Sequence, residues 1–189
     1  MKKVLIVASS PRPRSNSTAL ALKAAEGVKD ARAEAEVVQI GNSNIKPCTA
    51  CDACRNNPDK KCIIDDDMQP LYGKIKESQG IIFATPVYWF NMSAQMKLFI
   101  DRTYATREGN LYALTGKDVA VILTYEDKDV FASGGINALR SFQDIFKYVS
   151  ANLVGAVYGT ANKQGEVQSN ESLLKEAYKL GRRIAISYS

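Results

Sequence analysis

All four cysteines of the 189-residue chain lie between positions 48 and 62, with the spacing C-x2-C-x2-C-x7-C. Two successive C-x2-C turns place three thiols on one tight loop, and the fourth returns from further along the chain. Four thiolates arranged in this way can hold a [4Fe–4S] cluster. Three other interpretations stay open: a zinc site, a redox-active thiol pair, and a cysteine-rich loop without metal. The candidate ligands are Cys48, Cys51, Cys54 and Cys62.

Three aspartates, Asp65, Asp66 and Asp67, follow the cysteines directly. Three adjacent carboxylates could ligate a hard cation. Carboxylates also suit the positive end of a helix dipole. We therefore expect these residues to open a helix over 65–78.

A loop rich in hydroxyl groups and arginine, SSPRPRSNSTA (9–19), follows the first predicted strand. It ends where a helix is predicted to begin, and the free N–H groups and dipole at a helix N-terminus favour an anion. Arginine adds paired hydrogen bonds to phosphate oxygens. The loop therefore predicts phosphate binding. The sequence contains neither G-x-x-x-x-G-K-[ST] nor G-x-G-x-x-G, which counts against a nucleotide triphosphatase and weakens a dinucleotide site.

Two further loops carry residues that suit a flat ligand. TPVYWFNMS (85–93) has three consecutive aromatic residues, and TYEDKDVFASGG (124–135) ends in a glycine pair that permits close backbone approach. Aromatic side chains in this position could fill the core, cover an interface or flank a ring. With the phosphate loop, they describe a flavin mononucleotide pocket, and they would suit another flat phosphorylated ligand almost as well.

These loops need a scaffold that brings them together. Short apolar runs typical of buried parallel strands alternate with segments of helical periodicity. The strands are predicted at 3–9, 34–40, 80–86, 117–124 and 154–161, and the helices at 16–28, 65–78, 93–105, 136–153 and 171–187. This alternation predicts an α/β fold, a three-layer doubly wound five-stranded parallel sheet in the order 2-1-3-4-5. The loops after strands 1 and 3 then meet at the ligand-binding edge.

Length and composition predict one domain over 1–189, with a cysteine-rich insertion at 46–64. The net charge is +5, but lysine and arginine are scattered, so we expect no nucleic-acid partner. No apolar stretch approaches the roughly 18 residues of a membrane span, and the run 4–8 is too short for a signal peptide. We expect a cytoplasmic protein. The absence of histidine excludes most catalytic triads.

Three motifs, in this order, resemble one family. SPRPRSNS (10–17), PCTACDAC with CIIDDDM (47–68), and TPVYW with KLFIDR (85–102) are similar to the NAD(P)H-dependent FMN reductases of flavodoxin-like fold, close to the iron–sulfur flavoprotein branch. The resemblance implies bound FMN that receives hydride from NAD(P)H. It further implies a small-molecule or protein electron acceptor, such as ferredoxin, and a homodimer or homotetramer. It implies no membrane and no nucleic-acid partner.

The resemblance also assigns residues. Ser10, Arg12, Ser15, Asn16 and Ser17 would hold the phosphate, and 86–91 would line the ribityl chain and the ring. Ser9 departs from the glycine of many relatives. The full set of expected FMN contacts is Ser9, Ser10, Arg12, Ser15, Asn16, Ser17, Thr18, Pro86, Val87, Tyr88, Trp89, Phe90, Asn91, Thr124, Ser133 and Gly134. No side chain is expected to be catalytic, because FMN would carry the chemistry.

Two alternative functions share the fold and the cysteines. One is a non-enzymatic redox sensor or binding module that carries a cluster or zinc. The other is an electron-transfer flavodoxin. The net positive charge of the chain and Arg12 in the phosphate loop count against the flavodoxin, because electron-transfer flavodoxins are typically acidic.

Overall fold

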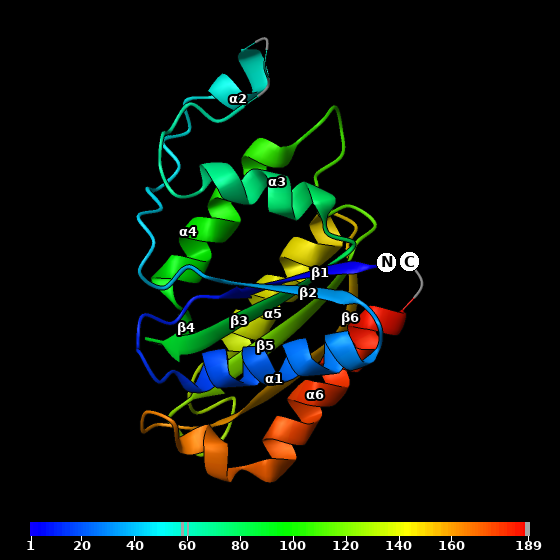
Figure 1. Cartoon of the computed structure of the whole chain (residues 1–189). Helices are drawn as coiled ribbons and strands as arrows, with labels where there is room; N and C mark the ends of the chain where they lie inside the picture. The colour runs from blue at the N-terminus through cyan, green and yellow to red at the C-terminus, as the bar shows by residue number, and fades with distance from the viewer. Residues whose placement is uncertain (58, 60, 188–189) are drawn as a thin grey trace.

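The computed structural model describes residues 1–57, 59 and 61–187 (Figure 1). Positions 58 and 60 of the predicted insertion, and 188–189 at the end of the predicted domain, lie outside the described residues. The strands are β1 (Lys3–Ala8), β2 (Glu34–Gln39), β3 (Gly80–Tyr88), β4 (Asn91–Met92), β5 (Asp118–Tyr125) and β6 (Asn152–Thr160). The helices are α1 (Asn16–Asp30), α2 (Ala53–Asn56), α3 (Gln69–Glu77), α4 (Ala94–Arg102), α5 (Gly135–Tyr148) and α6 (Glu171–Ile186), with 3₁₀ turns η1 (Thr103–Thr106) and η2 (Glu166–Ser169).

The sheet has the predicted topology. Its long strands are ordered β2-β1-β3-β5-β6, and every neighbouring pair is parallel. Without the two-residue β4, this is the predicted order 2-1-3-4-5, so the flavodoxin-like doubly wound sheet is confirmed. The sequence did not predict β4, which folds back against the end of β3 as an antiparallel hairpin.

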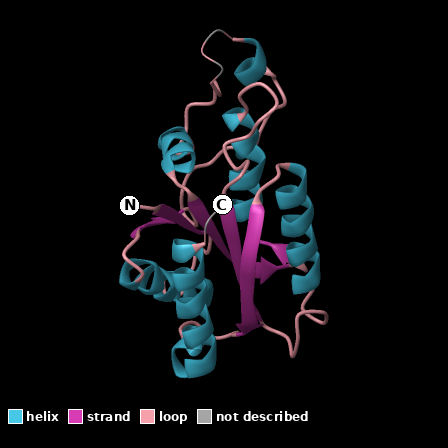
Figure 2. Cartoon of the chain, turned by 90° about the vertical axis from the view of Figure 1, so that its right-hand side faces the viewer, coloured by secondary structure: helices cyan, strands magenta, loops and turns pink. Residues whose placement is uncertain are grey.

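Helices cover both faces of the sheet (Figure 2). Along β1, Val4 and Ile6 point into a core shared with α1 and α6. Leu5 and Val7 point into the opposite core, shared with α3, α4 and α5. This alternation follows from the period of two along a strand, and it explains why the strand is apolar at every one of these positions.

The helix predicted over 65–78 begins four residues later, at Gln69. Asp66 does not open it, because its carboxylate accepts the Met68 N–H at 3.0 Å and pairs with Arg102. Asp67 is also occupied elsewhere, since its carboxylate accepts the Asn44 N–H at 2.7 Å. The expectation of an aspartate-led helix start is therefore wrong.

Several other boundaries differ from the sequence prediction, and two of them lie at the same turn. The helix predicted over 136–153 ends at Tyr148, and β6 begins at Asn152 rather than 154. Ser150 has a φ of +55°, which reverses the chain between the two elements. The short helix α2, inside the cysteine segment, was not predicted.

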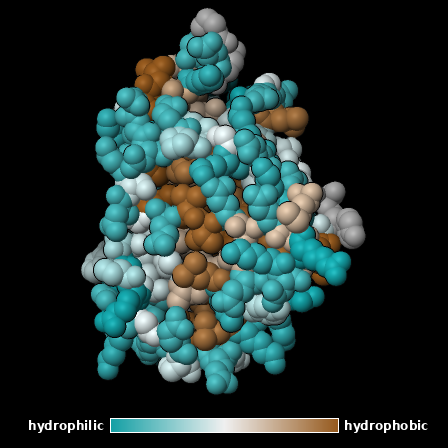
Figure 3. All heavy atoms as spheres, viewed as in Figure 1, coloured by the Kyte–Doolittle hydropathy of each residue, from teal (hydrophilic) through white to brown (hydrophobic). Residues whose placement is uncertain are grey.

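The surface around this scaffold is mostly polar. Figure 3 shows hydrophobic side chains gathered across the middle of one face, over and beside the edge strand β2. No helix in the described part of the chain is long and apolar enough to cross a membrane.

Candidate functional site

A cleft of about 410 Å³ lies where β1, β3, β5 and β6 end. The carboxyl ends of parallel strands are the usual ligand-binding edge of such sheets. The volume falls within the range of small-molecule sites, roughly 300–1,000 Å³. The walls come from the last residues of β3 and β5, the start of α1, and the loops that follow the strands.

The N-terminus of α1 forms one end of the cleft. Ser15 caps this helix, because its side chain accepts the Thr18 N–H at 3.3 Å, and its Oγ lies 3.1 Å from the Oγ of Ser17. The first N–H groups of a helix, which here belong to Asn16 and Ser17, have no acceptor within the helix. Together with the helix dipole, these donors form an anion site that fits a phosphate group.

Gly41 supports this phosphate loop from behind. A Cβ atom at position 41 would lie 2.0 Å from the backbone oxygen of Ser10 and 2.7 Å from the nitrogen of Pro11. These distances are too short for any non-bonded pair. Glycine therefore lets the backbone after β2 pass directly against the loop.

Polar bridges tie the rim of the cleft together. The Arg12 guanidinium donates to the backbone oxygen of Asn162 at 3.2 Å, and the Asn162 side chain donates to Glu126 at 3.0 Å. The side-chain amide of Asn16 donates to two backbone oxygens of the 161–163 loop, at 3.1 and 2.9 Å. The loops after β1, β5 and β6 are thereby fixed relative to one another.

The β3–β4 hairpin carries the aromatic wall. Its two turn residues, Trp89 and Phe90, both have positive φ, at 47° and 67°. A turn of this kind usually contains Asn-Gly, and each larger residue costs about 1–2 kcal/mol. The Trp89 side chain lines the cleft yet is 94% exposed. Backbone strain beside a ligand cleft is typical of a functional site.

The start of α5 holds the hairpin in place. A Cβ atom at Gly134 would lie 2.5 Å from the Cβ of Phe90, and Gly134 has a φ of +73°. The Asn137 side chain donates to the backbone oxygen of Phe90 at 3.1 Å. The Ser133 Oγ accepts the Gly135 N–H at 3.2 Å. Ser133 and Gly134 therefore support the aromatic wall.

A buried cluster of hydroxyl groups joins β1, β3 and α4. The Ser9 Oγ lies 2.8 Å from the Ser93 Oγ, which in turn lies 3.2 Å from the Thr85 Oγ1. Ser93 also caps α4 by accepting the Met96 N–H at 3.3 Å. Ser9 is fully buried and contributes to this junction.

The cleft brings together most of the residues expected to contact FMN. Those that line it are Ser10, Arg12, Ser15, Asn16, Pro86, Val87, Tyr88, Trp89 and Thr124. Those that lie around it instead are Ser9, Ser17, Thr18, Phe90, Asn91, Ser133 and Gly134. The contacts of both sets with the ligand stay predictions.

The cleft has lining residues beyond the expected contacts. Arg14, Tyr125 and Glu126 lie in two of the loops that the sequence placed at this edge. Sequence reasoning missed Ala161, Asn162 and Gln164, which belong to the loop after β6. The rule that ligands bind beyond strand ends applies equally to this loop, whose polar sequence TANKQG (160–165) was the available signal.

All four cysteines line a second, smaller cavity, with Arg102 and Tyr104 on its wall. None of the four forms a disulfide bond. Between them, Ala50 and Asp52 both have positive φ, at 52° and 55°, so the loop is held in an uncommon conformation. Among the described residues, no group of three cysteine, aspartate or glutamate side chains is arranged to hold a single metal ion.

The thiols of this cavity influence one another. Burial, followed by the charge of the neighbouring Cys62, raises the pKa of Cys54. A hydrogen bond from the Ala53 backbone lowers the pKa of Cys51. The four sulfurs therefore share one electrostatic environment, although they come from different turns of the segment.

Comparison with known proteins identifies the family. The family model of the NADPH-dependent FMN reductases matches residues 2–166. The chain belongs to this family. It is an NAD(P)H-dependent flavin oxidoreductase, as the resemblance of its motifs implied.

Among characterised relatives, an iron–sulfur flavoprotein of Archaeoglobus fulgidus is 31% identical over 188 residues, which cover 98% of this chain and 80% of the relative. An iron–sulfur flavoprotein of Methanocaldococcus jannaschii is 28% identical over 191 residues, covering 97% and 95%. The solved NAD(P)H:quinone oxidoreductase of Methanothermobacter marburgensis superposes with a TM-score of 0.72 at 17% identity, covering 97% of this chain and 99% of that structure. This last likeness shows the shared fold.

The residues of the cleft fit FMN. The anion site at α1 suits the phosphate, the aromatic hairpin suits the ring, and the cleft connects the two. Gly41 and Gly134 leave room for backbone where any side chain would collide.

Proposed function

We propose that this FMN reductase passes electrons from NAD(P)H to a small-molecule or protein acceptor, for example a ferredoxin, and carries a [4Fe–4S] cluster on Cys48, Cys51, Cys54 and Cys62. The observation that carries the proposal is the convergence of all four cysteines on one cavity. Relatives that match nearly the whole chain bear the name iron–sulfur flavoprotein.

The arrangement of the thiols favours a cluster over zinc. A single zinc ion draws its ligand sulfurs to about 2.3 Å from one point. A four-iron cube instead binds each thiolate at a separate corner. All four cysteines line one cavity, and their adjacent C-x2-C turns resemble the compact cluster motif more than the two separated C-x2-C units of many structural zinc sites.

In the cleft, the chain binds and orients the cofactor. The N–H groups and hydroxyls of the α1 N-terminus hold the phosphate, and the rim bridges between Arg12, Asn162 and Glu126 keep the loops closed around it. Tyr88 and Trp89 of the hairpin, which line the cleft, would cover the ring. FMN supplies the hydride and electron chemistry when it is bound.

The assembly and the location form part of the same proposal. Trp89 and Phe90 are exposed at 94% and 54% beside the cleft, and Phe131 is exposed at 72%. Exposed aromatic surface of this kind marks an interaction site, which supports the expected homodimer or homotetramer. Clustered cysteines without a disulfide bond suit a reducing compartment such as the cytoplasm, where they more often bind metal.

The first experiment tests both cofactors on one sample. Protein purified without oxygen is assayed for FMN, iron and acid-labile sulfide, and its visible spectrum is recorded with and without NAD(P)H. We expect FMN with about four irons and four sulfides per chain. FMN reduction without iron, even after reconstitution, would leave a flavin reductase with a thiol-rich loop. Protein that takes up no FMN and oxidises no NAD(P)H would favour a redox sensor.

Arg12→Ala tests the phosphate end. Loss of a charge-assisted hydrogen bond, worth about 1.5–3 kcal/mol, should weaken FMN binding about tenfold or more in a fluorescence titration. The matched control is Arg140→Ala, which removes an exposed arginine paired with Asp144 on α5. Equal FMN affinity in both variants would refute the assignment.

A further inference from the structure

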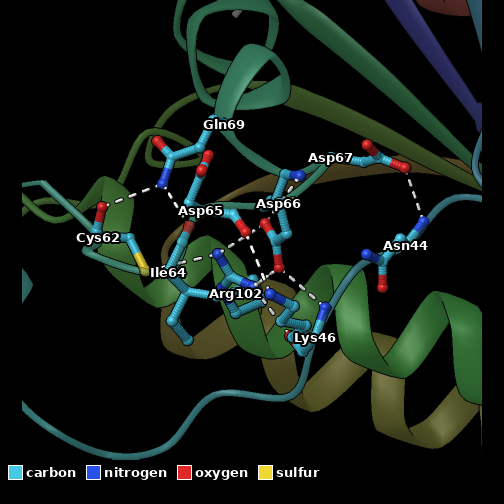
Figure 4. A network of polar contacts seen from close by, with 10 residues as sticks. Asn44, Lys46, Cys62, Ile64, Asp65, Asp66, Asp67, Gln69 and Arg102 are labelled. Carbon is cyan, nitrogen blue, oxygen red and sulfur yellow. Dashed lines mark hydrogen bonds and ion pairs between the residues drawn. The ribbon is translucent and has the colours of Figure 1, made fainter.

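Arg102 is a buried charge at the base of the cysteine segment. Its side chain is 1% exposed, and its guanidinium makes a forked ion pair with Asp66, with N–O distances of 2.5 and 3.1 Å. It also donates to the backbone oxygen of Lys46 at 2.9 Å (Figure 4). Lys46 precedes the first cysteine and Asp66 follows the last. Arg102 therefore holds both ends of the segment together.

The same guanidinium reaches one of the cysteines. The Arg102 Nη2 lies 3.5 Å from the Sγ of Cys62, and Figure 4 shows the sulfur turned toward the guanidinium. From the other side, the Gln69 side chain donates to the backbone oxygens of Cys62 and Ile64, at 3.1 and 2.6 Å. Cys62, the cysteine most distant in sequence from the others, is thereby positioned by α3 and α4.

Two buried hydrogen-bond donors beside Cys62 have no acceptor in the described part of the chain. The Nε of Arg102 and the hydroxyl of Tyr72 are buried, and neither has a hydrogen-bond partner among the described residues. The Tyr72 hydroxyl lies beside both Cys62 and Arg102. A buried donor without an acceptor costs about 1–3 kcal/mol, so such groups generally have a partner that the chain itself does not supply.

We propose that Arg102 and Tyr72 are positioning residues for the metal–sulfur group of the cysteine cavity: Arg102 holds Cys62 within the ligand set, and the two unpaired donors hydrogen-bond to sulfur of the bound group. This inference rests on the cluster of the proposed function. Hydrogen bonds to cluster sulfurs set the reduction potential, because they stabilise the more negative reduced form. Both donors should therefore raise the potential.

Tyr72→Phe tests the donor role, because it removes only the unpaired hydroxyl. The matched control is Tyr178→Phe, which removes an exposed hydroxyl that donates to Asp30 at 2.9 Å, away from the cysteine cavity. Each protein is reconstituted without oxygen with ferrous iron and sulfide, and the midpoint potential of the cluster is titrated. We expect a more negative midpoint in Tyr72→Phe and an unchanged one in Tyr178→Phe.

The metal-free proteins give a second readout. Because the Tyr72 hydroxyl has no partner in the described chain, Tyr72→Phe should leave the thermal midpoint of the metal-free protein unchanged or raise it. A marked fall in that midpoint would show that the hydroxyl serves the fold, and would overturn the inference. Equal cluster potentials in wild type and Tyr72→Phe would overturn it as well.

Arg102→Lys tests the positioning role. Lysine keeps the charge but cannot form the fork that reaches Asp66 and Lys46 together. We expect the iron and sulfide bound per chain to fall by half or more, while FMN content stays at the wild-type value. Unchanged iron content would refute the role of Arg102.

The wild-type protein separates this inference from the proposed function. If it binds FMN and oxidises NAD(P)H but takes up no iron and sulfide, the inference fails and the flavin reductase stands. If it takes up iron and sulfide and Tyr72→Phe has no effect, the inference fails while the complete proposed function stands.

Discussion

Single residues in and around the cleft act mainly by positioning the backbone of its loops. Ser15 offers a hydroxyl at the phosphate end, whereas the side chain of Asn16, the next residue, holds the 161–163 loop. Gly41 contributes no side chain at all, yet its close approach to Ser10 determines where the phosphate loop lies. We therefore expect the affinity of the cleft for FMN to depend also on residues, such as Gly41, that do not line it.

Gly41→Ala is expected to weaken FMN binding. The new Cβ would lie 2.0 Å from the Ser10 backbone oxygen, so the phosphate loop must move. Misplacing one phosphate contact should raise the dissociation constant about tenfold, equivalent to about 1.4 kcal/mol. Fluorescence titration measures this dissociation constant. In Gly73→Ala, where the new Cβ meets nothing within 4 Å, FMN affinity should be unchanged. Wild-type affinity for FMN in Gly41→Ala would show that Gly41 does not determine the position of the phosphate loop.

At the level of elements, the β3–β4 hairpin connects the sheet to the cleft, and helix α4 connects it to the cysteine cavity. The β3–β4 hairpin presents strained aromatics at the cleft. Helix α4 begins at the buried hydroxyl cluster through Ser93 and ends with Arg102 at the cysteine cavity. Its nine residues span about 14 Å at 1.5 Å per residue. The position of the cysteine segment is thereby linked to the strand edge that forms the cleft.

Replacing Trp89-Phe90 with Asn-Gly should separate stability from function. Asn-Gly suits two consecutive positive φ angles, so relief of backbone strain should raise stability by about 1 kcal/mol or more. Loss of the aromatic wall should lower the affinity for FMN. Urea unfolding and FMN titration measure the two effects. Trp89→Ala, which keeps the strain but loses the indole, should lose affinity without gaining stability. A less stable Asn-Gly variant would show that the turn is not strained.

Gly181→Ala should destabilise the packing of α6 on α1. The added Cβ would lie 1.9 Å from the backbone oxygen of Ala24, so the helices must separate. The expected cost of about 1–3 kcal/mol exceeds the gain in helix propensity of up to about 1 kcal/mol. In the exposed control Gly73→Ala on α3, only the propensity gain remains, so stability should rise. Thermal or urea unfolding shows whether each variant loses or gains stability. A Gly181→Ala variant more stable than wild type would contradict the close contact between α6 and α1.

At the level of the whole molecule, buried carboxylates join distant parts of the chain. Asp118, at the start of β5, accepts hydrogen bonds from Lys2 at 2.6 Å, Ser187 at 2.7 Å and Asn152 at 2.7 Å. It therefore links the two ends of the described chain, which lie close together in Figure 1. Although burial opposes the charge, Lys2 and the other donors lower the pKa of Asp118, and Arg102 does the same for Asp66.

Stability should consequently fall in acid. A carboxylate whose folded pKa is lowered stabilises the fold above its unfolded value of about 3.9, and this contribution is lost as the pH falls toward the folded pKa. We expect the urea midpoint to decline below about pH 4–5. Asp118→Asn should be less stable at pH 7 but lose less between pH 7 and 3. The control Asp144→Asn, in an exposed pair, should follow wild type. Parallel pH curves for wild type and Asp118→Asn would refute the linkage.

The sequence by itself determined the sheet order, and it located the hydroxyl-rich loop, the aromatic loop and the cysteine cluster. These features have local signals: continuous apolar runs at strand spacing, a hydroxyl-rich helix start, and close cysteine spacing. Tertiary structure alone decided the pairing of Arg102 with Asp66, the approach of Gly41 to Ser10, and the entry of the 161–164 loop into the cleft. These contacts join segments that lie far apart along the chain. The packing of whole elements determines these contacts. Local periodicity does not encode which two charged side chains will be buried together.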